Sequence, residues 1–312
     1  MNRRELFKRT AALGLAAGIP SLLAGKLLAG TGGVPAQSAI GKTKPVSNPL
    51  TPPAEGSIPV AFPISDHAVV IDFCGPWEVF QDVEVHGRKD PPFHLYTVAE
   101  TKEPIIASGG MKIIPEYTFE TAPAPKVIVI PAQKANAAML DWIRTSTKST
   151  DVTMSVCTGA YVLAKTGLLS GKSATTFHTA YEDFAVEFPD IRLKRGARFV
   201  EDGNLASSGG LTSGMDLAFR VVERYFGRDV AEETAYNIEY QGRGWTNPDS
   251  NVVYSKPRHF TADKRLCPVC GMDSDPTITS VYKGKTYLFC LREHKEAFEK
   301  APARYVSAVQ GQ

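Results

Sequence analysis

The stretch Thr153–Gly167, TMSVCTGAYVLAKTG, places a single cysteine where an apolar, β-branched run gives way to helix-forming residues. We expect a strand to end just before Cys157 and a helix to begin just after it. At such a bend, the free N–H groups and the dipole of the first helical turn stabilise a thiolate and lower the thiol pKa. Gly159 permits close approach of the backbone. The stretch therefore indicates a nucleophile at Cys157, or alternatively a free cysteine that only packs in the core.

Short apolar runs alternate with helix-like segments through the middle of the chain. A continuous apolar run such as Val127–Ile130 is typical of a strand buried on both faces, so the pattern predicts a mostly parallel sheet covered by helices on both sides. Further on, a Gly-rich turn leads into an amphipathic helix. Its residues expected to face the sheet are Leu217, Val221, Val222 and Tyr225. We therefore expect one α/β domain over residues 57–245.

The first 36 residues have the composition of an export signal. A basic head with the pair Arg3-Arg4 precedes an apolar stretch rich in Ala, Leu and Gly, and small residues permit cleavage after Ala36 or Ala39. The pair resembles the twin-arginine signal, which implies that the twin-arginine export machinery carries the folded protein to the periplasm. The alternative is an uncleaved membrane anchor, although the glycines and a lysine in this stretch weaken a stable span.

Composition and charge suit a globular protein of more than one domain. The 312 residues are 43% hydrophobic, with 35 Lys and Arg against 33 Asp and Glu. Loss of residues 1–36 would remove five basic residues and one acidic residue, which changes the formal net charge from +2 to −2, so we expect no nucleic-acid partner. Segments 37–56 and 246–262, which contain many Pro and polar residues, are interpreted as linkers.

Three motifs within residues 57–245 carry a resemblance to a known family. They are DFCGPWEVF from Asp72, SVCTGAYVLAKTGLLSGKSATTFH from Ser155, and VEDGNLASSGGLTSGMDLAFRVVE from Val200. Together they resemble the ThiJ/PfpI family of the class I glutamine amidotransferase-like superfamily, in the branch of isonitrile hydratase and the sensor domains of AraC-type regulators. The resemblance implies a flavodoxin-like sandwich and suggests a homodimer. It also implies that Cys157 is the nucleophile of a hydratase or hydrolase of a small C–N compound, with no cofactor.

The same resemblance implies roles for three further residues. Asp72 falls where family members place an acidic residue beside the nucleophile, and a carboxyl group there can share a proton or orient water. The alternative for Asp72 is the cap of a helix that starts at Gly75. Thr158 matches the threonine that follows the cysteine and can hydrogen-bond substrate or water. His178 lies one position after the histidine usual in the family, and it either orients Cys157 or is a structural histidine.

One departure from the family pattern affects the expected pocket. Where much of the family has Pro-Gly-Gly after the central strand, this chain has Pro131-Ala132-Gln133. The backbone N–H groups that would form an oxyanion hole are retained, but the glycine freedom that aims them is reduced.

A cluster of cysteines near the C-terminus is the sharpest chemical signal in the chain. Cys267 and Cys270 form a C-x2-C knuckle, and Cys290 and His294 are four residues apart, so on a helix they share one face. Four ligands at this spacing predict a closed, non-catalytic Cys3His metal site, and a disulfide between the first two cysteines is the alternative. Between the two pairs, SVYKGKTYLF alternates around a Lys-Gly pair, as a β-hairpin does.

This C-terminal segment, residues 263–308, resembles the YHS domain, a small metal-associated α+β module. The family's last ligand position is usually cysteine, and His294 stands there in this chain. An imidazole is a chemically harder ligand than a thiolate, so its presence favours zinc over the softer copper(I) ion.

Two functions remain open from the sequence. The first is an exported, cysteine-dependent hydratase or hydrolase with a metal-binding module attached. The second is a non-enzymatic metal-binding or redox-sensing protein of the cell envelope, in which Cys157 is an oxidisable sensor. Transcription regulation is disfavoured, because no helix-turn-helix pattern follows the α/β domain and an exported protein would not meet DNA.

Overall fold

The computed structural model describes residues 46–255, 266–269 and 274–309, and the chain divides after Ser47 into two units, the second of which is Asn48–Gln312. The predicted export signal lies outside the described residues.

In the α/β domain, the longer helices and the strands of the main sheet are β1 (Ile58–Pro63), α2 (Val70–Gln81), β2 (Phe93–Ala99), β5 (Tyr117–Thr118), β6 (Val127–Ile130), α3 (Ala137–Ser146), β7 (Val152–Ser155), α4 (Gly159–Lys165), α5 (Tyr181–Glu187), β10 (Phe199–Asp202), β11 (Leu205–Ser208), α6 (Ser213–Phe226) and α7 (Arg228–Asn237). Shorter elements are β3 (Ile105–Ile106), β4 (Lys112–Ile113), β8 (Ser173–Ala174), η3 (His178–Ala180), β9 (Arg192–Leu193), η4 (Gly244–Thr246) and η5 (Val252–Tyr254).

The central sheet has seven strands in the order β10-β11-β7-β6-β1-β2-β5. All neighbouring strands are parallel except the edge strand β10, which pairs antiparallel with β11. Strand β6 lies at the centre, and all four of its residues are buried, as the continuous apolar run predicts. The expected flavodoxin-like α/β sandwich is confirmed.

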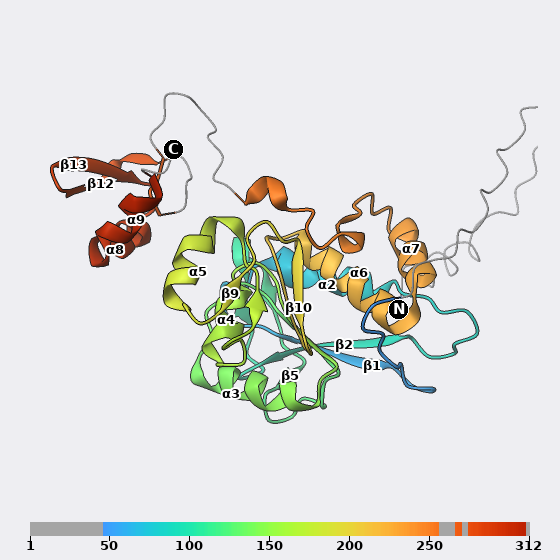
Figure 1. Ribbon diagram of the computed structural model, residues 1–312. Coiled ribbons are helices and arrows are strands. Elements are labelled where there is room, and N and C mark those ends of the chain that lie inside the picture. The colour runs from blue at the N-terminus through green and yellow to red at the C-terminus, as the bar shows by residue number, and fades with distance from the viewer. Residues whose placement is uncertain (1–45, 256–265, 270–273, 310–312) are drawn as a thin grey trace, which may run out of the picture. The chain divides into compact units, whose positions relative to one another are not determined.

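Helices cover both faces of this sheet (Figure 1). One face packs against α2 and α6 through side chains such as Val60, Phe62 and Val129, and the other packs against α3, α4 and α5 through Ile128 and Ile130. Adjacent residues of one strand therefore belong to opposite cores, as the alternation of side chains along a strand requires. The four residues of α6 that were expected to face the sheet are all buried.

Helix α2 differs from the sequence interpretation. It begins at Val70, so Asp72 lies inside its first turn and is not a cap of a helix starting at Gly75. Pro76 lies in the helix interior. Because proline has no N–H, the Asp72 carbonyl receives no helical hydrogen bond from that position.

The chain after α7 folds back onto the α/β domain as far as Ser255. We call the segment Gly244–Ser255 the strap; it contains η4 and η5. The Trp245 side chain is buried, and its backbone N–H donates to Asp216 Oδ1 at 2.8 Å. The Arg198 N–H donates to the Pro248 carbonyl. The part of the predicted linker that is described, up to Ser255, therefore packs on the domain.

The C-terminal module, described by itself, comprises the hairpin β12 (Asp275–Tyr282) and β13 (Lys285–Phe289), followed by α8 (Arg292–Lys300) and α9 (Pro302–Val309). The hairpin turns at Lys283 and Gly284, both with positive φ, as predicted. Phe289 and Phe298 form its small core.

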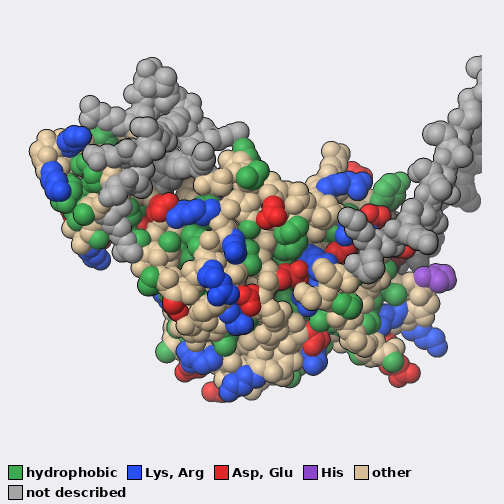
Figure 2. Space-filling view, in the orientation of Figure 1, with side chains coloured by type: hydrophobic (Ala, Val, Ile, Leu, Met, Phe, Trp, Pro, Cys, Tyr) green, Lys and Arg blue, Asp and Glu red, His purple; other side chains and the backbone are tan. Residues whose placement is uncertain are grey.

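No helix among the described residues is both long and apolar enough to cross a bilayer. On the face shown in Figure 2, the basic and acidic side chains of the described residues are interspersed. This mixture of charges is the usual surface of a globular protein.

Candidate functional site

Cys157 occupies a sharp bend between β7 and α4. Its φ is 58°, in the left-handed region that non-glycine residues rarely adopt, and its N–H donates to the Gly209 carbonyl at 3.0 Å. Two residues on, a Cβ at Gly159 would lie 2.3 Å from the Ile130 carbonyl oxygen, so only glycine fits there. The predicted strand-to-helix bend is present, between the end of β7 at Ser155 and the start of α4 at Gly159.

Asp72 reaches the same point from α2. Its side chain is fully buried, and Oδ2 accepts a hydrogen bond from the Ala132 N–H at 3.1 Å. Burial raises the pKa of the carboxyl group to about 6, although the Ala132 N–H and a hydrogen bond with Cys157 oppose the shift. Within the described part of the chain, Oδ1 has no hydrogen-bond partner. The structure thus brings together Asp72 and Cys157, two residues far apart in sequence.

The Cys157 thiol is protonated at rest. Only 6% of the residue is exposed, and burial together with the negative charge of Asp72 raises its pKa to about 12. The N–H groups of Thr158 and Leu211 and the Thr158 hydroxyl oppose this shift. The expectation of a depressed thiol pKa is therefore wrong, because desolvation beside a carboxylate outweighs the three donors.

His178 packs between two other aromatic rings. Its ring stacks on Tyr254, with centroids 5.1 Å apart, and meets the Phe177 ring edge-on at 4.5 Å. Burial lowers its pKa. Two residues earlier, the Thr176 hydroxyl donates to the Cys157 carbonyl at 3.0 Å.

The segment after β6 holds Asp72 and the residues at the end of β1 and just after it in place through hydrogen bonds. The Ala132 N–H binds Asp72, as described above, and the Gln133 side chain accepts from the Ser65 N–H at 2.7 Å and donates to the Pro63 carbonyl at 2.8 Å. The Ala132 N–H expected in an oxyanion hole is thus already used by the catalytic candidate Asp72. Donors that face the sulfur come instead from Thr158 and Leu211.

Leu211 is the residue that sequence reasoning missed. It lies in the turn between β11 and α6, has φ 44°, and is 39% exposed. The turn is tight, because a Cβ at Gly210 would lie 2.3 Å from the Phe177 ring. The run SSGGLTSG signals such a turn, but nothing in it indicates that a backbone N–H faces Cys157.

The C-terminal module gathers three of the four predicted metal ligands. The Nδ1 atom of His294 lies 3.1 Å from the Cys290 sulfur and 3.7 Å from the Cys267 sulfur, and all three ligand atoms lie within 4.8 Å of one another. A tetrahedral zinc ion with bonds of about 2.3 and 2.1 Å separates sulfur from nitrogen by about 3.6 Å, so the donor set fits. Cys270 lies outside the described residues.

The expected helical pairing of Cys290 and His294 is wrong in detail. Helix α8 begins at Arg292, so Cys290 lies between β13 and the helix. The two side chains still meet, because the chain turns directly from the strand into the helix. These described residues would supply three ligands to a zinc ion, one fewer than the four of a closed structural site.

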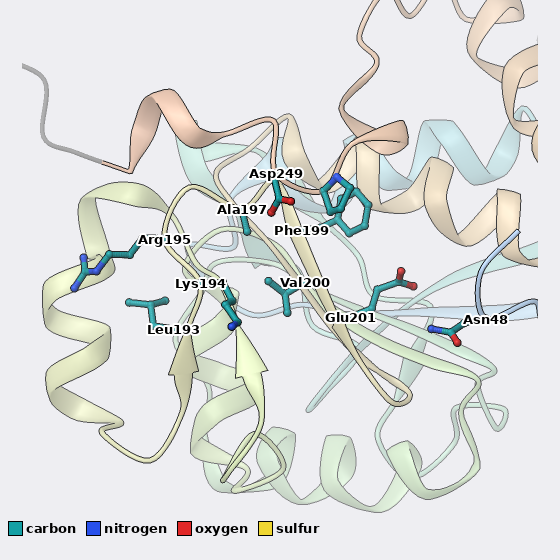
Figure 3. Close-up of a pocket in the computed structure, with 10 residues that line it drawn as sticks. Asn48, Leu193, Lys194, Arg195, Ala197, Phe199, Val200, Glu201 and Asp249 are labelled. Carbon is teal, nitrogen blue, oxygen red and sulfur yellow. The ribbon is translucent and has the colours of Figure 1, made fainter. Parts of the chain in front are cut away.

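A separate groove lies on the α/β domain along the edge strand β10 (Figure 3). It has a volume of about 630 Å³, and its lining residues include Lys194, Phe199, Glu201 and Asp249. The described residues that line it include neither Cys157 nor Asp72. The groove is therefore a different surface from the thiol site.

A mostly parallel sandwich with a cysteine at a strained bend and a buried acid beside it defines a class of α/β proteins. The chain belongs to the DJ-1/PfpI family, whose pattern matches residues 59–224, and the YHS domain pattern matches residues 267–309. The isonitrile hydratase of Pseudomonas putida is 32% identical over 59% of this chain and 79% of its own. The HTH-type transcriptional regulator CdhR of Pseudomonas aeruginosa is 22% identical over 57% of this chain and 55% of its own.

Solved structures agree on the fold. A ThiJ/PfpI family protein from Pseudomonas syringae has a TM-score of 0.53 and 25% identity, and covers 67% of this chain and 84% of its own. Drosophila melanogaster DJ-1beta has a TM-score of 0.51 and 18% identity, and covers 59% and 98% respectively. The latter likeness concerns the fold alone.

Proposed function

We propose that this protein is a cysteine-dependent hydratase of isonitriles or of a closely related small C–N compound. The observation that carries the proposal is that the buried Asp72 carboxyl group and the Cys157 thiol lie close enough at the bend for each to shift the pKa of the other. An isonitrile carbon must gain both a proton and a bond to a nucleophile, and an acid–thiol pair supplies both. The identity of 32% with an isonitrile hydratase supports the same chemistry.

The reaction proceeds in two balanced halves. In the first, the Cys157 sulfur bonds to the isonitrile carbon, and the thiol proton passes through Asp72 to that carbon, which gives the thioimidate R–N=CH–S–Cys. In the second, water adds across the C=N bond, with hydroxyl on carbon and a proton on nitrogen. The C–S bond then breaks, the hydroxyl proton returns to sulfur, and the N-substituted formamide R–NH–CHO leaves. The sum is the addition of one water with no change of redox state.

The pKa values of Asp72 and Cys157 support this order of reaction steps. With a pKa of about 6, Asp72 is mostly ionised at neutral pH and can accept the thiol proton. The thiol remains protonated until attack, and the Thr158 and Leu211 N–H groups then stabilise the developing charge on sulfur. The module that binds metal is not needed for these steps.

The test is formation of N-benzylformamide from benzyl isonitrile by the full-length protein. We expect Cys157→Ala to abolish turnover and Asp72→Asn to lower kcat/KM by about 10²- to 10⁴-fold. Removal of metal with a chelator should leave the rate unchanged. Formamide production by Cys157→Ala at the wild-type rate would rule the proposal out.

The second candidate is a non-enzymatic metal-binding or redox-sensing protein. The cluster of Cys267, Cys290 and His294 supports it. This candidate predicts stoichiometric metal, no isonitrile turnover, and oxidation of Cys157 by peroxide without loss of metal.

We also propose that the chain is exported by the twin-arginine machinery to the periplasm, binds zinc rather than copper, and forms a homodimer. The pair Arg3-Arg4 and the apolar stretch after it support export, and the Cys/His donor set supports zinc. Cell fractionation with an Arg3→Lys/Arg4→Lys variant tests the export. Elemental analysis tests the metal, and light scattering tests the dimer.

A further inference from the structure

The strap ends directly beside the residues that position Cys157. Within it, the Asn251 side chain donates to Ser213 Oγ at 3.2 Å, and a Cβ at Gly209 would lie 2.8 Å from Asn251 Nδ2. Gly209 is the residue whose carbonyl accepts from the Cys157 N–H. Figure 1 shows the strap, in orange, following α7 along the α/β domain. The strap therefore touches the turn that carries the donors to the sulfur.

A series of backbone and side-chain contacts leads from the sulfur to the end of the strap. The Leu211 N–H faces the thiol, Gly210 packs against the Phe177 ring, and the His178 ring lies between Phe177 and Tyr254. Leu211 and Tyr254 are 39% and 40% exposed, and Phe177 and His178 are half-buried. An exposed apolar surface close to a reactive group is where a substrate's apolar part is expected to lie.

From this arrangement we propose that Phe177, His178 and Tyr254 form an aromatic shelf at the entrance to the Cys157 site, and that the shelf selects substrates with an aromatic or flat apolar substituent on the reacting carbon–nitrogen group. The proposal rests on the proposed function for its reaction. It makes Tyr254 a specificity-determining residue, although Tyr254 lies beyond residues 57–245, the α/β domain predicted from the sequence. Rings stack on aromatic surfaces better than small alkyl groups do. Burial lowers the His178 pKa, so the middle of the shelf is uncharged at neutral pH.

The experiment measures substrate selection by the aromatic shelf separately from the catalytic reaction. Cys157 of the full-length protein is alkylated with iodoacetamide or with N-benzyl iodoacetamide, and the rate of each is followed on the Cys157 peptide by mass spectrometry. The ratio of the two rates measures selection of the benzyl group without any turnover. In parallel, kcat/KM is compared for benzyl and methyl isonitrile.

In Tyr254→Ala we expect the benzyl preference to fall about 2- to 12-fold in alkylation and in turnover, while Tyr254→Phe keeps it, because one stacked pair contributes on that scale. Tyr254→Leu retains bulk without a ring and should behave like Tyr254→Ala. Val253→Ala is the matched control, since Val253 lies in the same segment, is 53% exposed and is not part of the shelf.

An unchanged benzyl preference in folded Tyr254→Ala and Tyr254→Leu would overturn the shelf. Absence of isonitrile turnover, with a benzyl preference in alkylation that depends on Tyr254, would overturn the proposed reaction and leave the shelf in place.

Discussion

Asp72→Asn should stabilise the protein while it removes activity. Folding raises the pKa of Asp72 from 3.8 to about 6, a shift of about 2 units, and each unit corresponds to about 1.4 kcal/mol. The ionised side chain therefore costs the folded state about 3 kcal/mol at pH 7 or above. Asparagine carries no charge, and its carbonyl oxygen can still accept from the Ala132 N–H. We expect the free energy of unfolding to rise by up to about 3 kcal/mol at pH 7.

The sign of the pH dependence follows from the raised pKa. The stability that Asp72 contributes in its protonated form is fully present below about pH 4 and is lost as the pH rises through about 6. The difference between Asp72→Asn and wild type should therefore be near zero at pH 4 and reach its full value above pH 7. Urea unfolding followed by tryptophan fluorescence measures it, because Trp77, Trp142 and Trp245 all lie in residues 57–245.

Asp216→Asn is the matched control. Asp216 is equally buried, but it pairs with Arg198 and accepts from the Tyr240 hydroxyl at 3.0 Å. Removal of its charge leaves the partly buried Arg198 guanidinium without its ion-pair partner, so we expect the free energy of unfolding to fall by up to about 3 to 5 kcal/mol. Lower stability of Asp72→Asn than of wild type at pH 7, or a stability difference that does not vary with pH, would refute the account of Asp72.

Three further outcomes are expected. Gly159→Ala should lower the free energy of unfolding by at least about 1 to 3 kcal/mol, because its Cβ would lie 2.3 Å from the Ile130 carbonyl oxygen, which is backbone and cannot yield; urea unfolding at the wild-type midpoint would contradict this. The kcat/KM for isonitrile should fall below about pH 6, as Asp72 becomes protonated and can no longer accept the thiol proton; a rate that is flat from pH 5 to 8 would argue against a base at this position. Cys290→Ser should lower bound zinc, measured by elemental analysis, about 10-fold or more, whereas Cys74→Ser should leave it unchanged, since Cys74 packs against the core of the α/β domain. Equal zinc in the two variants would exclude Cys290 as a ligand.

The sequence predicted that Asp72 and Cys157 belong to one site, but it did not predict the pKa of the Cys157 thiol. A cysteine between a β-branched run and a helical run, with glycine two residues later, marks a bend from local preferences alone. The pKa of its thiol depends on burial and on a carboxylate from another helix, and those are properties of the packed sheet. A local argument from the helix terminus therefore predicted the wrong direction for the Cys157 pKa.

The sequence by itself determined the mostly parallel sandwich, the bend at Cys157 and the cluster of Cys and His residues in the small C-terminal module, because periodicity and residue spacing can be read directly along the chain. Only the tertiary structure decided that His178 stacks on Tyr254, that Leu211 faces the sulfur, and that residues up to Ser255 pack on the α/β domain. These are contacts between segments distant in sequence, and no local pattern specifies which surfaces meet when the sheet and its helices pack together.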